Sequence, residues 1–190
     1  MIKNLFRILI FTLFFFAIIQ PVNASQNSYV SVVNPIRGND FWDIKNQRID
    51  TVVLGQNEIL RKYNVKATYL IRYDAFLSLD LINKLKDFPD EKGLFLEITP
   101  SWTKDCGVDY HKGETWHSAG SAFLTGYELT ERERLIDIAF EKFKSTFGNY
   151  PKSVGAWWID AHSLNFMQEK YGITSALIVA KQYTTDKYKI

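Results

Sequence analysis

Short apolar segments alternate with amphipathic ones along most of the chain, and this alternation predicts an α/β protein. Five segments are rich in β-branched and aromatic residues, which is typical of strands: residues 29–33, 65–71, 93–98, 153–159 and 175–180. Between them, apolar residues recur at helical spacing over residues 45–63, 77–88, 128–147 and 162–170. Strands that are apolar on both faces suit a parallel sheet covered by helices.

Two parallel architectures fit this order, a doubly wound sheet and a (β/α) barrel. No glycine-rich phosphate loop follows a predicted strand, which disfavours a nucleotide-binding doubly wound fold. We therefore expect a parallel (β/α) barrel, incomplete or distorted. The sequence reaches its last residues, TTDKYKI, soon after the fifth predicted strand. We expect either a truncated C-terminus or an open barrel.

Three local features carry further expectations. Asn34-Pro35 should end the first strand, because proline lacks the N–H that a ladder needs. Residues 101–127 show no periodicity and should form a long functional loop. Thr130 with Glu133 could form a capping box at the start of the following helix.

Residues 1–24 have the pattern of a secretory signal peptide. Lys3 and Arg7 precede a nearly unbroken apolar run, and Val22-Asn23-Ala24 gives a small-residue ending before Ser25. An uncleaved N-terminal anchor is the alternative. Residues 25–190 should then form a single domain that is secreted or otherwise extracytoplasmic, in the periplasm or at the cell surface.

Removing the signal segment makes the remaining charge balanced. The chain has 23 Lys+Arg and 21 Asp+Glu, and the segment takes two basic residues with it, which leaves 21 of each. A neutral domain does not indicate nucleic acid or a membrane surface as a partner. Cys106 is the single cysteine, so no internal disulfide is available, and no evident base lies near it in sequence.

Candidate site residues follow the predicted strands, because the carboxyl ends of parallel strands gather at one rim. Glu97 and Asp160 are the carboxylates at the ends of the third and fourth predicted strands. The predicted substrate-binding residues are Asn34, Arg37, Arg72, Asp74, Trp102 and Trp158. Carboxylates, amides, arginines and indoles on one rim suit a polyhydroxylated ligand, because rings stack on the apolar faces of sugars.

Several of these residues also have purely structural interpretations. Asp160 stands directly before a predicted helix, where aspartate is a favoured N-cap. Glu97 could be a buried carboxylate held by Arg37 or Arg72. Asp74 could simply begin a turn. In a regular strand Trp157 and Trp158 point to opposite faces, so only one would face the rim.

A metal site is not predicted. His111 and His117 lie close to Asp109 and Glu114, but their spacing is H-x5-H in a loop and lacks the i, i+4 geometry of a helical zinc site.

The order of elements, Glu91-Lys92-Gly93 before the third strand, and FGNYPKSVGAWWID over residues 147–160 resemble the NodB-type polysaccharide deacetylase superfamily of β/α-barrels. In that family, an aspartate pair after strand one and an H-x-x-x-H motif after E-x-G bind a divalent metal. Here Asn34 and Pro35 replace the acids, while Phe95 and Thr99 stand where the two histidines would be. The resemblance therefore implies a divergent member without the metal motif and without a cofactor.

Related barrels include glycosidases that use two carboxylates, and the resemblance implies this role for Glu97 and Asp160. Carboxyl groups about 5–5.5 Å apart would favour retention of configuration, and about 6.5–9.5 Å inversion. The expected function is a secreted hydrolase that acts on a polysaccharide or oligosaccharide by a metal-free, two-carboxylate mechanism. The alternative is a catalytically inactive, glycan-binding member of the same fold.

Overall fold

The computed structural model describes residues 30–40, 49–113 and 118–178. Contacts divide the chain after Val30, and the fold below belongs to the unit that begins at Ser31. The predicted signal peptide, residues 45–48 of the first expected helix, His117, Glu114 and residues 179–190 lie outside the described residues. Within the described ranges, no helix combines the length and the hydropathy needed to cross a membrane.

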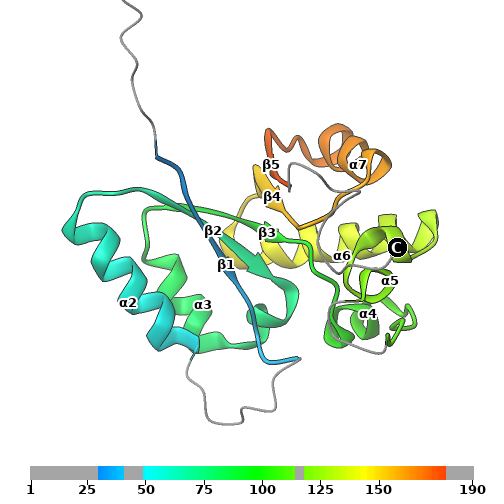
Figure 1. The fold of residues 1–190 in the computed structure, drawn as a ribbon, viewed down its shortest axis with the longest axis horizontal. Helices are drawn as coiled ribbons and strands as arrows, with labels where there is room; N and C mark the ends of the chain where they lie inside the picture. The colour runs from blue at the N-terminus through cyan, green and yellow to red at the C-terminus, as the bar shows by residue number, and fades with distance from the viewer. Residues whose placement is uncertain (1–29, 41–48, 114–117, 179–190) are drawn as a thin grey trace, which may run out of the picture. The chain divides into compact units, whose positions relative to one another are not determined.

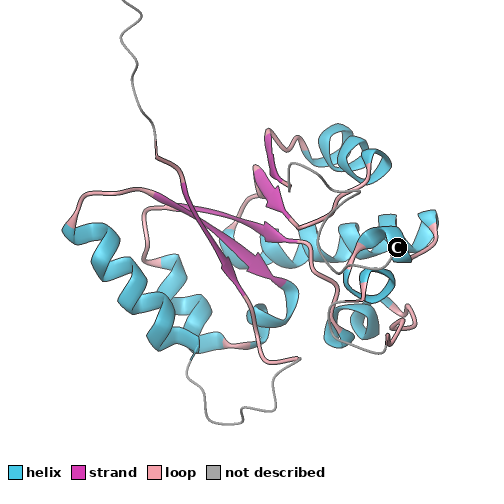
Figure 2. Ribbon diagram, viewed as in Figure 1, coloured by secondary structure: helices cyan, strands magenta, loops and turns pink. Residues whose placement is uncertain are grey.

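Five parallel strands form one sheet whose spatial order follows the sequence (Figures 1 and 2). They are β1 Val32–Ile36, β2 Ala67–Arg72, β3 Glu91–Phe95, β4 Ser153–Gly155 and β5 Ser175–Leu177. A doubly wound sheet reverses its strand order at a switch point, and this sheet does not. The consecutive order confirms the expected incomplete (β/α) barrel, in which every crossover runs in the same direction.

Helices connect the strands close to the predicted positions. They are α2 Ile49–Lys62, α3 Leu79–Lys86, α4 Pro100–Cys106, α5 Ala119–Ala122, α6 Leu129–Phe147 and α7 Ala161–Tyr171, with 3₁₀ turns η1 Tyr73–Leu77 and η2 Leu124–Gly126. Gly148 and Gly172 end α6 and α7 in the left-handed conformation, which glycine adopts without steric cost.

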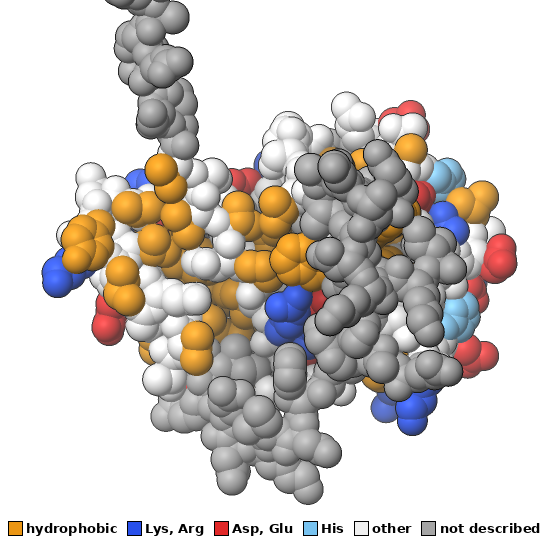
Figure 3. Space-filling model, viewed as in Figure 1, with side chains coloured by type: hydrophobic (Ala, Val, Ile, Leu, Met, Phe, Trp, Pro, Cys, Tyr) orange, Lys and Arg blue, Asp and Glu red, His pale blue; other side chains and the backbone are white. Residues whose placement is uncertain are grey.

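The strands divide their side chains between two faces. Tyr69, Ile71 and Leu94 point to the helices and join the main hydrophobic core, together with residues such as Leu85 and Phe140 from α3 and α6. The alternate positions point to the inner face, the side that a closed barrel would enclose. Figure 3 shows hydrophobic side chains exposed in the middle of the face that it presents.

The prediction that Asn34-Pro35 ends the first strand was wrong. β1 continues through both residues, and Pro35 pairs in register with Leu70. Among the described residues, β1 is an edge strand bonded to β2, so a residue without an N–H can sit in it at little cost.

The expected loop at residues 101–127 is in large part helical. Thr99 caps α4 by accepting a hydrogen bond from the Trp102 amide, and Pro100 occupies the first helical position. The capping residues of α6 also differ from the prediction. The Glu128 amide donates to the Glu131 carboxylate at 3.1 Å, two residues earlier than the proposed Thr130–Glu133 pair.

Candidate functional site

A buried network of four charged side chains lies where strands β1, β2 and β3 end. Arg72 is the last residue of β2 and is 1% exposed, and Glu97 lies just beyond β3 and is 2% exposed. The Arg72 Nη1 donates to Glu97 Oε2 at 2.7 Å. Arg37 reaches the same carboxylate through Nε at 2.7 Å and Nη2 at 3.2 Å. Two arginines thus share one buried glutamate.

Arg72 is held from its other side by Asp74. Its Nε and Nη2 donate to the two Asp74 oxygens at 2.7 and 2.8 Å, a bidentate geometry that suits a guanidinium. Burial alone lowers the pKa of Arg72, but hydrogen bonds and charges from Asp74 and Glu97 outweigh it, so the pKa is raised above its ordinary value. Arg72 is therefore a permanent cation that bridges two acids.

The loop after β1 wraps around Asp74. The amides of Gly38 and Asp40 donate to the two Asp74 oxygens at 3.0 and 3.1 Å. A Cβ on Gly38 would come within 2.5 Å of Asp74 Cγ, so only glycine fits there. Asp40 in turn accepts a hydrogen bond from the Ser101 amide at 2.9 Å, which ties this loop to α4.

Half-buried aromatic side chains border the network. The Arg37 guanidinium lies over the Phe95 ring, 5.1 Å from its centroid, and Trp157 packs edge-on against Phe95 at 6.1 Å. Trp157 and Trp158 are both partly exposed and pack against a small cluster around Phe123. One cation and two accessible indoles thus stand next to each other at the carboxyl end of the sheet.

Asp160 has a clear structural role. It is the N-cap of α7, with its carboxylate accepting from the Ser163 amide at 2.9 Å and from the Ser163 hydroxyl at 2.7 Å. The capping interpretation is confirmed. Arg132 of α6 approaches the same carboxylate at 3.4 Å. The Asp160 side chain is 17% exposed, which leaves it partial contact with solvent.

The predicted site residues thus fall into three groups. The structure brings together Arg37, Arg72, Asp74 and Glu97, and the salt-bridge interpretation of Glu97 is confirmed. Asp160 and Trp158 lie in the segment between β4 and α7. The catalytic roles of Glu97 and Asp160 stay predictions.

Two predicted substrate-binding residues are placed elsewhere. Trp102 was expected at the rim, but it is 1% exposed, stacks on Tyr73 at 5.6 Å and donates its indole N–H to the Leu135 carbonyl. It is a core residue because its apolar faces and its N–H are all satisfied inside. Asn34 lies within β1, three residues before Arg37, and its buried Nδ2 has no hydrogen-bond partner.

Sequence reasoning missed Gly38, Phe95 and Trp157. Gly38 lies within the short polar run after the first strand, and a glycine at such a point signals a close backbone approach. Phe95 and Trp157 were assigned to strands without a role at the rim. The period-2 alternation from Arg72 and Glu97 could have placed them on the same face.

The loop histidines give no metal site in the part of the chain that is described. His111 Nδ1 lies 2.7 Å from the Gly126 carbonyl, and its ring stacks on Tyr127 at 4.4 Å. No group of three or more His, Cys, Asp or Glu side chains with metal-binding geometry occurs among the described residues.

No family model and no curated protein matches the sequence. Solved structures do resemble the fold. A peptidoglycan N-acetylglucosamine deacetylase, crystallised with a naphthyl N-hydroxybenzamide, matches with a TM-score of 0.51 and 14% identity over 80% of this chain and 57% of that chain. A protein from Mycobacterium smegmatis assigned as a polysaccharide deacetylase matches with a TM-score of 0.52 and 14% identity, over 75% and 48%.

The chain spans about half the length of these structures. At this identity the likeness concerns the fold, and it agrees with the five consecutive parallel strands and their helices. The protein therefore has the β/α fold that these two polysaccharide deacetylase structures share.

Proposed function

We propose that the protein is an extracytoplasmic, carbohydrate-binding member of this fold that binds glycans without hydrolysing them. The observation that carries the proposal is the state of Glu97. Its carboxylate lies just beyond β3, and two arginines occupy it with three hydrogen bonds.

A carboxylate that performs hydrolysis must reach the sugar. A nucleophile needs an exposed lone pair, and a general acid needs a proton within hydrogen-bond distance of the leaving oxygen. Glu97 is 2% exposed, and both of its oxygens already accept from guanidinium groups. Freeing it would leave Arg72 with one acid fewer in a buried setting, which is costly.

The Asp160 carboxylate is also occupied by hydrogen bonds. Both of its oxygens accept hydrogen bonds from Ser163, and these bonds begin α7. Using it as an acid or base would remove the helix cap, which is worth about 1 kcal/mol. Of the two predicted catalytic acids, Asp160 is the more accessible, and it alone would not make a two-carboxylate site.

The aromatic border supports binding. Trp157 and Trp158 are partly exposed at the strand ends, and Arg37 is a nearby donor whose side chain is 29% exposed. Indole faces stack on the C–H faces of sugars, while a guanidinium donates to hydroxyl or acetamido oxygens. The fold's solved relatives include a protein that acts on peptidoglycan N-acetylglucosamine, which makes acetamido sugars the first ligands to test.

Hydrolysis by Glu97 and Asp160 is the alternative, favoured because both residues follow neighbouring parallel strands and because enzymes share the fold. Four variants separate the two functions: Trp158→Ala, Glu97→Gln, Asp160→Asn and, as an exposed-aromatic control directly after α2, Tyr63→Ala. Chitooligosaccharide binding is measured by calorimetry, and turnover by acetate release and by new reducing ends.

Binding by the wild type, lost in Trp158→Ala and kept in Tyr63→Ala, with no turnover, is the expected result. Turnover that disappears in Glu97→Gln or Asp160→Asn, while thermal unfolding shows the variants folded, would refute the proposal and establish the hydrolase.

A further inference from the structure

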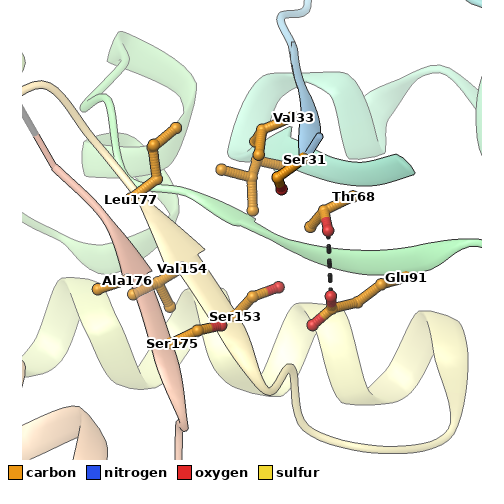
Figure 4. Close-up of a pocket in the computed structure, with 10 residues that line it drawn as sticks. Ser31, Val33, Thr68, Glu91, Ser153, Val154, Ser175, Ala176 and Leu177 are labelled. Carbon is orange, nitrogen blue, oxygen red and sulfur yellow. Dashed lines mark hydrogen bonds between the residues drawn. The ribbon is translucent and has the colours of Figure 1, made fainter. Parts of the chain in front are cut away.

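A pocket of about 300 Å³ opens on the inner face of the sheet, at the opposite end from the charged network. Thr68, Glu91, Ser153 and Ser175 lie at or next to the first residues of β2, β3, β4 and β5, and they line it (Figure 4). The network and the indoles lie after the last residues of the same strands. This pocket is therefore a separate site, at the amino ends of the strands.

The pocket contains a buried hydroxyl without a partner. Ser153 is 4% exposed, and its Oγ makes no hydrogen bond, a condition that among the described residues it shares with Asn34 Nδ2. A buried polar atom without a partner is costly, so native structures rarely keep one without a reason. Here the unpaired hydroxyl faces a cavity large enough for a small molecule.

The rest of the lining is divided between polar and apolar groups. The Thr68 hydroxyl donates to Glu91 Oε2 at 3.1 Å, which fixes an acceptor carboxylate at the mouth, where Ser175 is also exposed. Figure 4 shows these side chains and Ser153 turned toward the same space. Leu70 and Leu177 are among the residues that form the apolar part of the wall.

The absence of a side chain at Gly93 makes room for the Ser153 side chain. A Cβ there would lie 2.4 Å from Ser153 Oγ and 2.8 Å from a Leu70 methyl group, so a larger residue would push both side chains away. Gly155 has the same relation to Leu70, at 2.4 Å. The two glycines let Leu70 and the Ser153 hydroxyl lie flat against the sheet and leave the space above them open.

We propose that this pocket binds a monosaccharide-sized polyol, a single sugar ring or cyclitol. Such a ligand presents hydroxyls to Ser153, Ser175 and Glu91 and a C–H face to Leu70 and Leu177. An acyl chain would leave the hydroxyls unpaired, and a metal ion would find one carboxylate and an apolar wall. A polyol can form hydrogen bonds with the polar side of the pocket and apolar contacts with the other side.

The test uses the full chain with glucose, N-acetylglucosamine and inositol as probes, titrated to tens of millimolar and followed by calorimetry and by NMR. Ser153→Ala should weaken binding about tenfold, the value of roughly one hydrogen bond. Ser175→Phe fills the exposed mouth and should abolish binding. Ser145→Ala, on the exposed side of α6, is the matched control and should bind as the wild type does.

Two further readouts keep this site apart from the rim. Trp158→Ala should leave inositol binding unchanged, so failure of the rim proposal does not affect this one. Ser153→Ala should melt at or above the wild-type temperature, because it removes an unsatisfied atom. The proposal is overturned if no probe binds saturably, if Ser153→Ala and Ser175→Phe both bind normally, or if Trp158→Ala abolishes inositol binding.

Discussion

Removing Arg72 should destabilise the protein more than removing any other member of the charged network. Arg72 donates to Asp74 twice, to Glu97 once and to the Gly38 carbonyl at 3.3 Å, and it is fully buried. In Arg72→Met, Asp74 keeps only the backbone amides of Gly38 and Asp40 as partners. An uncompensated buried carboxylate should cost about 4–5 kcal/mol of unfolding free energy.

The other two deletions should cost less, for reasons visible in the contacts. Glu97→Gln leaves Arg72 paired with both oxygens of Asp74, and we expect a loss of about 3 kcal/mol, at the low end for a broken buried pair. Arg37 is partly exposed, so Arg37→Met should cost about 1–2 kcal/mol. Arg61→Met removes an arginine from the more exposed pair with Asp90 and should cost no more than about 1 kcal/mol.

Urea unfolding of these four variants and of Asp74→Leu gives the free energies directly. The double variant Arg72→Met/Asp74→Leu removes both partners of the bidentate pair, so its loss should be smaller than the sum of the two single losses. Arg37→Met costing as much as Arg72→Met, or Arg72→Met matching Arg61→Met, would show that the network is not the buried, coupled unit described above.

Three further predictions concern single residues. Burial raises the pKa of the Cys106 thiol to about 12, so a thiol reagent at pH 8 should modify it only when the protein unfolds. The unfolding free energy should fall between about pH 9 and 12, because the thiol ionises at lower pH in the unfolded chain than in the folded protein. Asp160→Ala should lower the unfolding free energy by about 1 kcal/mol through loss of the α7 cap, with Asp160→Asn close to wild type. Gly38→Ala should strongly lower the melting temperature by displacing Asp74, whereas Gly55→Ala, with open space around it in α2, should raise it through a gain of about 0.5–1 kcal/mol.

The architecture could be predicted from sequence because periodicity is a local property. Apolar runs such as residues 93–98 and the helical spacing over residues 128–147 each identify their element without any long-range information. Edge position is a long-range property, and for that reason the strand through Pro35 was missed. Helix α4 was missed because it is a short element of 7 residues within an aromatic-rich segment, stabilised by its Thr99 cap and Pro100 start.

The location of the site could be predicted from the sequence, but the ion pairs and hydrogen bonds of its side chains could not. Strand ends gather in any parallel sheet, so Arg37, Arg72 and Glu97 could be expected near one another. The sequence could not decide whether Glu97 is an available acid or a satisfied ion pair, because that depends on side-chain geometry between residues 60 positions apart. Trp102 shows the same difficulty, since only packing distinguishes a rim indole from a core indole.

Buried polar groups are paired at the carboxyl ends of the strands, whereas one is unpaired at the amino ends, and this contrast bears on function. At the carboxyl ends, Arg72, Asp74 and Glu97 satisfy one another, which is the condition expected of a structural network. At the amino ends, the Ser153 hydroxyl is buried without a partner beside an open pocket, a cost that folding alone does not explain. If the strand-end site binds glycans without hydrolysing them, recognition should rest on the partly exposed indole of Trp158 and on the unpaired Ser153 hydroxyl at the opposite end. Because the two lie at opposite ends of the strands, substitutions at one should leave ligand binding at the other intact.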